Sequence, residues 1–261
     1  MPPEYHLESF WDDRFTKENH FEWLGDGSNT ILPPIEKYLR TKRGHRPRVL
    51  HIGAGTSTFS SEIFKLYGQH FGDNKVEEGL IVNTDYSEVA LERGKTSEEG
   101  KNKWICWERT DLMSWPDIQT LKRTQLFEIV VDKSTSDAIS CNEDITFEPS
   151  KTTPNNTCPL VATYIANNPD SVLKLEPVEL LALHIATLVR PGGIWVALSY
   201  SRYRFDFLVG VGGEKEEHVV TCIKILGARG SDRGRCTVGV AKGGSVCTSS
   251  AAFCICSSEN R

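Results

Sequence analysis

Short apolar runs alternate with amphipathic stretches along most of this chain. Five runs rich in β-branched and other apolar residues predict buried strands: 48–52, 80–84, 104–107, 127–131 and 194–200. After the first run, apolar residues recur at helical spacing from Phe59 to Tyr67, with Ser57 or Thr58 as a candidate N-cap. A second helix is predicted from Pro177 to Val189, where the Pro-Gly-Gly at 191–193 ends it.

Strands that alternate with helices predict an α/β fold. We expect a doubly wound, Rossmann-like domain with a mostly parallel sheet, right-handed crossovers and helices on both faces. In such a sheet ligands bind at the carboxyl ends of the strands. The loops that would form a site therefore begin at Gly53, Asp85, Asp111 and Asp132.

Two regions depart from this alternation. Residues 141–175 contain much Asn, Thr and Pro without a clear period, so we expect an inserted loop. Residues 209–261 hold five of the eight Cys, and nine of the 21 Gly lie between 210 and 244. Strands are predicted at 219–226 and 236–241, but no amphipathic helix precedes them. We therefore expect the C-terminal hairpin to be missing or irregular, and 209–261 to be an atypical, disordered tail.

Composition narrows the possible partners. The 261 residues carry 30 Lys and Arg against 35 Asp and Glu, a net charge of −5, which argues against general binding to nucleic acid or membrane surfaces. No apolar run is long enough for a membrane span, and the start lacks a signal-peptide pattern, so the cytoplasm is the expected compartment. The C-terminal cysteines show no metal-binding spacing, so no metal is expected.

The first predicted strand ends in a glycine turn, Gly53-Ala54-Gly55-Thr56-Ser57. Glycines there let backbone approach a ligand closely, and a following helix aims free N–H groups at it. A tight strand-to-helix turn without a ligand would look the same. A dinucleotide fingerprint would need a third glycine at position 58, which is Thr58, so the pattern disfavours a nicotinamide cofactor.

Two acidic residues follow the second and third predicted strands. Asp85 is placed to accept hydrogen bonds from both hydroxyls of a ribose, although it would also suit a helix N-terminus. Asp111 and Leu112 would offer a carboxylate to an adenine amino group and an apolar flank to its ring. Taken alone, Asp111 is equally a turn residue.

Several motifs, in order, resemble one family. The matching segments are Phe10-Trp11-Asp12-Asp13-Arg14-Phe15, Phe21-Glu22-Trp23-Leu24-Gly25, Gly53-Ala54-Gly55-Thr56-Ser57, Asp85-Tyr86-Ser87, Asp132-Lys133-Ser134-Thr135-Ser136-Asp137-Ala138 and Leu188-Val189-Arg190-Pro191-Gly192-Gly193. Together they resemble the seven-stranded (class I) S-adenosylmethionine-dependent methyltransferases. The closest resemblance is to the methyltransferase-like proteins that methylate lysines of translation elongation factor 1-alpha and other proteins.

The resemblance implies a methyltransferase domain over 1–208, with an aromatic cofactor-lid segment at 1–47 and the core at 48–208. It implies S-adenosyl-L-methionine as cofactor and a protein substrate, such as a translation elongation factor, methylated on lysine. The implied cofactor-binding residues are Trp11, Arg14, Gly53, Ala54, Gly55, Thr56, Ser57, Asp85, Tyr86, Ser87, Asp111, Leu112 and Asp132. Because the resemblance stops after residue 208, a retained intron or altered reading frame is our hypothesis for 209–261.

The N-terminal motif allows two interpretations. Trp11 and Arg14 share a face of a helix, and the guanidinium could clamp the methionine carboxylate of the cofactor, or form a surface ion pair with Asp12 or Asp13. The aromatic residues Trp11, Phe15, Phe21 and Trp23 would either close over the cofactor or staple the segment to the domain.

Methyl transfer from a sulfonium is an in-line displacement, so alignment and desolvation are the main requirements. An acceptor lysine must be neutral, and a nearby carboxylate can orient it. Asp132 is the catalytic candidate, with Asp137 behind it; the alternatives are an N-cap for Asp132 and a solvated helix position for Asp137.

Two residues depart from the family pattern. His51 stands where many class I enzymes have an acidic residue, and we expect a hydrogen-bonded structural histidine. Ser134 replaces a glycine, which matters only if the backbone there needs a positive φ. Three alternative functions stay open: a cofactor-binding interaction module with weak catalysis, a small-molecule methyltransferase and a nicotinamide-dependent dehydrogenase.

Overall fold

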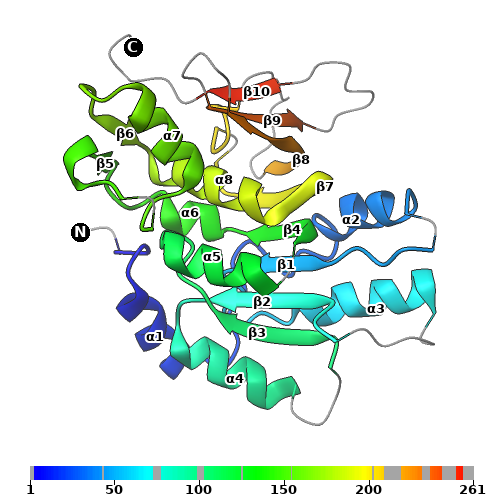
Figure 1. Cartoon of the computed structure of the whole chain (residues 1–261). Coiled ribbons are helices and arrows are strands. Elements are labelled where there is room, and N and C mark those ends of the chain that lie inside the picture. Colours follow the sequence, from blue (N-terminus) through cyan, green and yellow to red (C-terminus); the bar gives the residue numbers. More distant parts are fainter. Residues whose placement is uncertain are drawn as a thin grey trace.

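The computed structural model of the chain describes residues 3–42, 44–72, 78–98, 103–124, 126–153, 155–201, 203–208, 219–230, 236–242 and 251–254. Its largest element is an eight-stranded sheet with the order β10-β9-β8-β7-β4-β1-β2-β3 (Figure 1). The five predicted strands form its parallel part: β1 (Val49–Ile52), β2 (Ile81–Asp85), β3 (Ile105–Arg109), β4 (Phe127–Lys133) and β7 (Val189–Ser199). The predicted α/β fold is confirmed.

Helices cover both faces of this parallel sheet. Each face of the sheet has its own hydrophobic core, and successive residues of β1 point to opposite cores. Val49 belongs to the core with α2 (Leu32–Leu39) and α3 (Phe59–Phe71). Leu50 and Ile52 belong to the core with α5 (Trp115–Thr124) and α8 (Pro177–Leu188). All four residues of β1 are buried, as expected for a central strand covered on both sides. The helices α1 (Glu8–Lys17) and α4 (Glu88–Glu98) lie at the β3 edge (Figure 1).

The segment 141–175 is not the structureless loop that its composition predicts. It contains β5 (Ile145–Phe147), a short 3₁₀ turn (Pro149–Lys151), α7 (Pro159–Asn167) and β6 (Leu173–Leu175), and β5 pairs antiparallel with β6. The helix α7 buries Leu160, Val161, Tyr164 and Ile165 in the same core as α8. The apolar stretch is only one short helix long, and Asn residues on both sides hide its period.

The strands after residue 208 extend the sheet. β8 (Val219–Gly230) runs antiparallel along β7, β9 (Cys236–Lys242) runs antiparallel along β8, and β10 (Ala251–Cys254) follows β9. The pairing of β8 with β9 shifts between Ile225 and Gly227, so the meander is present and irregular. The predicted strands at 219–226 and 236–241 are confirmed, and β7 is not an exposed edge. The rest of 209–261, for which disorder is predicted, lies outside the described residues. The side chains of the cysteines in 209–261 are not described either.

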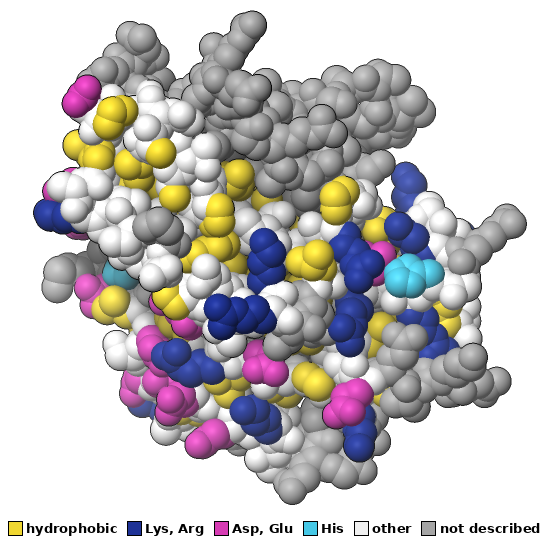
Figure 2. Space-filling view, viewed as in Figure 1, with side chains coloured by type: hydrophobic (Ala, Val, Ile, Leu, Met, Phe, Trp, Pro, Cys, Tyr) yellow, Lys and Arg dark blue, Asp and Glu magenta, His cyan; other side chains and the backbone are white. Residues whose placement is uncertain are grey.

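The described surface carries both signs of charge. Figure 2 shows acidic side chains gathered at the lower left, around α1, and basic ones toward the middle and right. Among the described residues, no helix has the length and apolar character needed to cross a membrane. The described residues also contain no group of three or more His, Cys, Asp or Glu side chains that could hold a metal ion.

Candidate functional site

A pocket opens at the carboxyl ends of β1, β2, β3 and β4, beside the point where the strand order reverses between β1 and β4. Its walls come from the turns after these strands and from the N-terminal segment. The lining residues are Tyr5, His6, Trp11, Phe15, Phe21, Trp23, Gly53, Ala54, Gly55, Thr56, Ser57, Asp85, Tyr86, Thr110, Asp111, Leu112, Met113, Lys133, Ser134, Thr135, Ala138, Ile139 and Asn142. Most of the turn residues that the sequence predicts as ligand contacts are thus brought together, but Ser87 and Asp132 are not among the lining residues.

The turn after β1 requires its two glycines. Gly53 and Gly55 have φ values of +54° and +56°, in the left-handed region that favours glycine. A Cβ at Gly53 would lie 2.2 Å from the Thr135 Oγ1, and one at Gly55 would lie 2.9 Å from the Phe15 ring. Other residues at these two positions would therefore push apart three walls of the pocket.

Asp85 joins the end of β2 to the glycine turn. Its carboxylate accepts hydrogen bonds from the backbone N–H of Gly55 at 2.8 Å and of Ser87 at 2.9 Å. Burial raises the pKa of Asp85 to about 6, against the effect of these bonds to backbone N–H groups. Each carboxylate oxygen has lone pairs beyond these bonds, so Asp85 can still accept from a ligand hydroxyl.

The turn after β3 supplies one acidic and one apolar wall. Asp111 Oδ1 accepts a hydrogen bond from the backbone N–H of Met113 at 2.8 Å, which fixes the turn. Leu112 is buried, and its carbonyl oxygen lies 2.8 Å from a ring nitrogen of the buried His184 on α8. The side chains of both Asp111 and Leu112 line the pocket.

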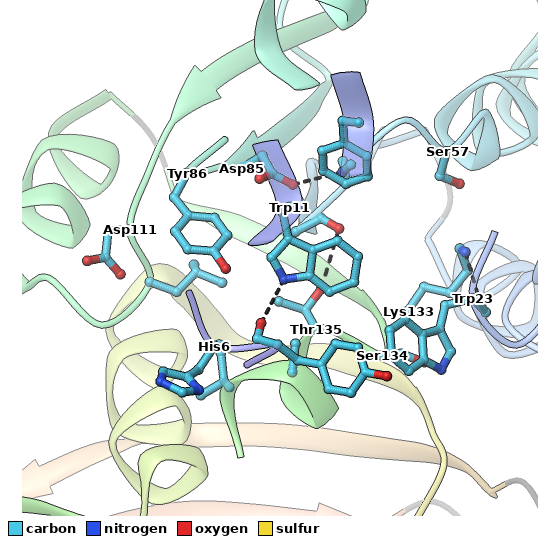
Figure 3. Close-up of a pocket in the computed structure, with 18 of the residues that line it drawn as sticks. His6, Trp11, Trp23, Ser57, Asp85, Tyr86, Asp111, Lys133, Ser134 and Thr135 are labelled. Carbon is cyan, nitrogen blue, oxygen red and sulfur yellow. Dashed lines mark hydrogen bonds between the residues drawn. The ribbon is translucent and has the colours of Figure 1, made fainter. Parts of the chain in front are cut away.

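Aromatic side chains of the N-terminal segment form the roof of the pocket. Trp11 lies in the middle of the pocket in Figure 3, and its indole Nε1 donates to the Tyr5 carbonyl oxygen at 2.7 Å. Its ring centroid is 5.6 Å from that of Phe15, 6.1 Å from Phe21 and 5.8 Å from Trp23. The rings pack on one another, as the staple interpretation expects, and they also line the pocket, while their closure over a cofactor stays a prediction.

Arg14 and Ser87 lie outside the pocket wall. The Arg14 guanidinium stacks on the Phe21 ring at 3.8 Å and pairs with Glu18 at 3.3 Å, while its Nε is buried without a hydrogen-bond partner. The Ser87 hydroxyl donates to Asp12 Oδ1 at 2.5 Å. The Ser87 hydroxyl therefore ties α1 to the rest of the domain, whereas the Arg14 contacts lie within the N-terminal segment. Of the surface ion pairs offered as an alternative for Arg14, the structure has one with Glu18 in place of Asp12 or Asp13.

Asp132 also lies beneath the wall. Its Oδ1 accepts from the backbone N–H of Thr135 at 2.8 Å and of Ser136 at 3.2 Å, so it caps α6 (Thr135–Ile139). The side chain is fully buried, its Oδ2 has no partner, and burial raises its pKa to about 7. Asp132 thus accepts from the first N–H groups of α6 as a capping residue does, although Ser134 occupies the N-cap position itself.

Asp137 faces away from the pocket, toward the turn that follows β7. Its carboxylate accepts from the Ser199 hydroxyl at 2.6 Å, the Tyr200 backbone N–H at 2.8 Å and the Arg204 Nε at 3.0 Å. It is buried, so it is not the solvated helix residue that the sequence allows as an alternative.

Two departures from the family pattern are explained by the backbone and by hydrogen bonds. Ser134 has a φ of +68°, so this position does need the left-handed conformation that glycine adopts more easily. His51 lies 3.0 Å from the Ser60 hydroxyl through its Nδ1, and burial lowers its pKa to about 3. His51 is thus a neutral structural residue, as expected.

Sequence reasoning missed part of the wall. The pocket residues without a prediction are Tyr5, His6, Thr110, Met113, Lys133, Ser134, Thr135, Ala138, Ile139 and Asn142. Met113, Lys133 and Ala138 directly follow a predicted residue along the chain, so for these three residues that proximity was the available signal. Tyr5 and His6 carry no such signal, because only the path of the N-terminal segment brings them to the pocket.

The arrangement suits a nucleoside. A carboxylate at the end of β2 matches vicinal hydroxyls, an acidic and an apolar residue at the end of β3 match an adenine ring, and the glycine turn leaves space for close approach. These are the features that the sequence predicts for S-adenosylmethionine, and the residues present fit that group.

Comparisons with known proteins identify the family. The chain is 31% identical over 209 residues to "Methyltransferase srdJ" of Neurospora crassa, covering 78% of this chain and 70% of that protein. It is 28% identical over 145 residues to the human "eEF1A lysine and N-terminal methyltransferase", covering 54% of this chain but only 18% of that protein.

No family model matches the chain. A solved S-adenosylmethionine-dependent methyltransferase from Anabaena variabilis overlaps 78% of this chain and 65% of its own, with a TM-score of 0.45 and 10% identity. The fold and the long match to the Neurospora protein agree, and S-adenosylmethionine is the cofactor that they imply. The chain belongs to the class I S-adenosylmethionine-dependent methyltransferases.

Proposed function

We propose that this methyltransferase methylates a lysine side chain of a protein. The observation that supports the proposal is the convergence of two segments on one pocket: the aromatic segment around Trp11 and Trp23, and the segment that follows β4. These are the segments whose patterns resemble the protein-lysine methyltransferases. The relatives named for elongation factor lysine methylation match over 54% of this chain, which makes that factor the first substrate to test.

The predicted site residues fall into two groups: those that would touch the cofactor and those that hold the walls of the pocket. In this proposal Asp85 accepts from the ribose hydroxyls, Asp111 and Leu112 hold the adenine with Tyr86, and the backbone of 53–57 faces the methionine part of the cofactor. Asp132 and Asp137 act as positioning residues, because they hold the walls of the pocket without lining it. Arg14 and Ser87 act in the same way on the N-terminal helix.

The aromatic roof favours the required state of the acceptor. A lysine amine attacks only when it is neutral, and apolar surroundings disfavour its charged form. Tyr5, Trp11 and Trp23 supply such surroundings. The cofactor, when bound, supplies an electrophilic methyl group, and this chain supplies alignment and exclusion of water.

The full chain with methyl-labelled S-adenosylmethionine tests the proposal. Purified elongation factor 1-alpha and a fractionated cell extract would be the acceptors, with Asp85→Asn as the control with weakened cofactor binding. We expect label on protein, mapped to lysine by mass spectrometry. Label found only in the small-molecule fraction would replace the proposal with the small-molecule alternative. Cofactor binding without any transfer would favour the interaction-module alternative.

A further inference from the structure

Lys133, the residue after the Asp132 cap, buries its ammonium group under the N-terminal segment. The side chain is only 5% exposed and forms an ion pair with Glu22. Its Nζ also donates to the carbonyl oxygens of Trp23 at 3.3 Å and Gly25 at 3.4 Å. All three of these acceptors belong to the N-terminal segment.

The backbone of that segment is shaped around the ammonium group. Leu24 has a φ of +59° and Gly25 a φ of +80°. Leu24 is one of two described residues other than glycine with a positive φ, a conformation that costs a leucine free energy. The turn at 23–25 brings two carbonyl oxygens to one cation, which explains why this conformation is kept.

Glu22 joins the same cation to the glycine turn. Its Oε1 accepts from the Ser57 hydroxyl at 2.9 Å and from the Thr58 backbone N–H at 3.3 Å. The neighbouring Phe21 N–H donates to the Thr56 Oγ1 at 3.1 Å. Glu22 therefore touches the turn after β1 and the end of β4 at once, although it does not itself line the pocket.

We propose that Glu22 and Lys133 are a clasp that positions three walls of the cofactor pocket: the aromatic roof, the glycine turn and the end of β4. Trp23, Ser57 and Lys133 line the pocket, and each is held by this one ion pair. Opening the clasp would release the roof and the turn together. Buried pairs are sensitive to loss of one partner, since the other charge is left without compensation.

A double-mutant cycle on cofactor affinity tests the clasp in the full chain. The variants are Glu22→Gln, Lys133→Met and the double variant, and the probe is S-adenosylhomocysteine in calorimetric titration. We expect each single substitution to raise Kd about tenfold. The Kd of the double variant should be no more than about threefold above that of the single variants, because both substitutions break the same ion pair. The KM for cofactor should rise more than kcat falls.

A matched control and a second measurement keep the test decisive. Glu62→Gln removes the exposed pair between Glu62 and Lys65, whose charged atoms are 2.7 Å apart, and should leave Kd unchanged. If Lys133→Met does not fold, hydrogen exchange of Glu22→Gln decides, with faster exchange expected at 20–25 and 56–58 together. The clasp would be overturned by a Kd for Glu22→Gln within about twofold of wild type, or by unchanged hydrogen exchange at 20–25 and 56–58. It would also be overturned if the increase in Kd of the double variant equalled the product of the two single increases.

Discussion

The ends of β2 and β4 look alike in the sequence, because each has an aspartate after an apolar run, but the two aspartates have different contacts in the structure. Each strand has a buried aspartate in one of its last two positions, and burial raises the pKa to about 6 for Asp85 and about 7 for Asp132. Asp85 lines the pocket, whereas Asp132 caps α6 underneath it and leaves the wall to Lys133, Ser134 and Thr135. A carboxylate at a strand end therefore identifies the edge of the sheet where the pocket opens, but not which carboxylate lines that pocket.

The largest effect should come from the support behind the β4 end. Asp137→Ala removes the carboxylate that accepts hydrogen bonds from the Arg204 guanidinium and from the Tyr200 backbone N–H. Loss of one member of a largely buried pair typically lowers the free energy of unfolding by about 3 kcal/mol. Denaturant unfolding measures this value, and Glu62→Gln serves as a surface control. A loss no larger than that of the control would mean that Asp137 does not fasten the turn after β7.

Asp132→Ala should weaken the fold by a smaller amount. Removing the cap of α6 leaves the N–H groups of Thr135 and Ser136 without an acceptor. N-caps contribute about 0.5–2 kcal/mol to the free energy of unfolding. The same denaturant experiment, run below the Asp132 pKa of about 7 so that the buried charge does not contribute, gives the value. An undiminished stability would show that Asp132 does not support α6.

The pH dependence of cofactor affinity should follow Asp85. Its pKa of about 6 means that it gains its charge between pH 5 and pH 7, and the charged carboxylate accepts hydroxyl hydrogen bonds more strongly. We expect the affinity for S-adenosylhomocysteine to rise by up to about tenfold over this interval. Titration calorimetry at both pH values measures the change. In Asp85→Asn the slope should vanish, and an unchanged slope would assign the titration to another group.

Stability should show the opposite trend with pH. The pKa of Asp132 is higher in the folded chain than the ordinary value of 3.8, so the folded state binds more protons between about pH 4 and pH 7. The contribution of Asp132 to the free energy of unfolding is therefore present below that interval and is lost as the pH rises through 7. Thermal unfolding of wild type and Asp132→Asn across this range measures the difference, which should favour the variant increasingly at higher pH.

The smallest expected effect is at Ser134. Its left-handed backbone costs a serine free energy that glycine avoids, although Ser134→Gly also removes a 3.3 Å hydrogen bond to the Leu198 carbonyl oxygen. We expect a net gain of less than about 1 kcal/mol in the free energy of unfolding. The matched variant Ser136→Gly, at a helical position, should lose stability instead. A lower free energy of unfolding in both variants would show that the hydrogen bond of the Ser134 hydroxyl contributes more than the left-handed backbone costs.

Much of the fold follows from local pattern. The parallel strands and α8 have long or strongly apolar signals, and Gly53, Asp85 and Asp111 mark strand ends that the parallel order must bring to one edge. The helix α7 escapes prediction because its buried face is short and is flanked by Asn. The ion pair of Glu22 with Lys133 escapes prediction because 111 positions separate the two residues, and no local pattern encodes such a contact.

The most direct test compares the two strand ends in one assay. Calorimetric titration of S-adenosylhomocysteine into the full chain should give one site for wild type. Hydrogen bonds to a charged group are commonly worth about 1.5–3 kcal/mol, so Asp85→Asn should weaken affinity at least about tenfold. Asp132→Asn should stay within about threefold of wild type, since Asp132 lies beneath the wall. Equal losses in the two variants, or a larger loss for Asp132→Asn, would contradict the division between contact and support.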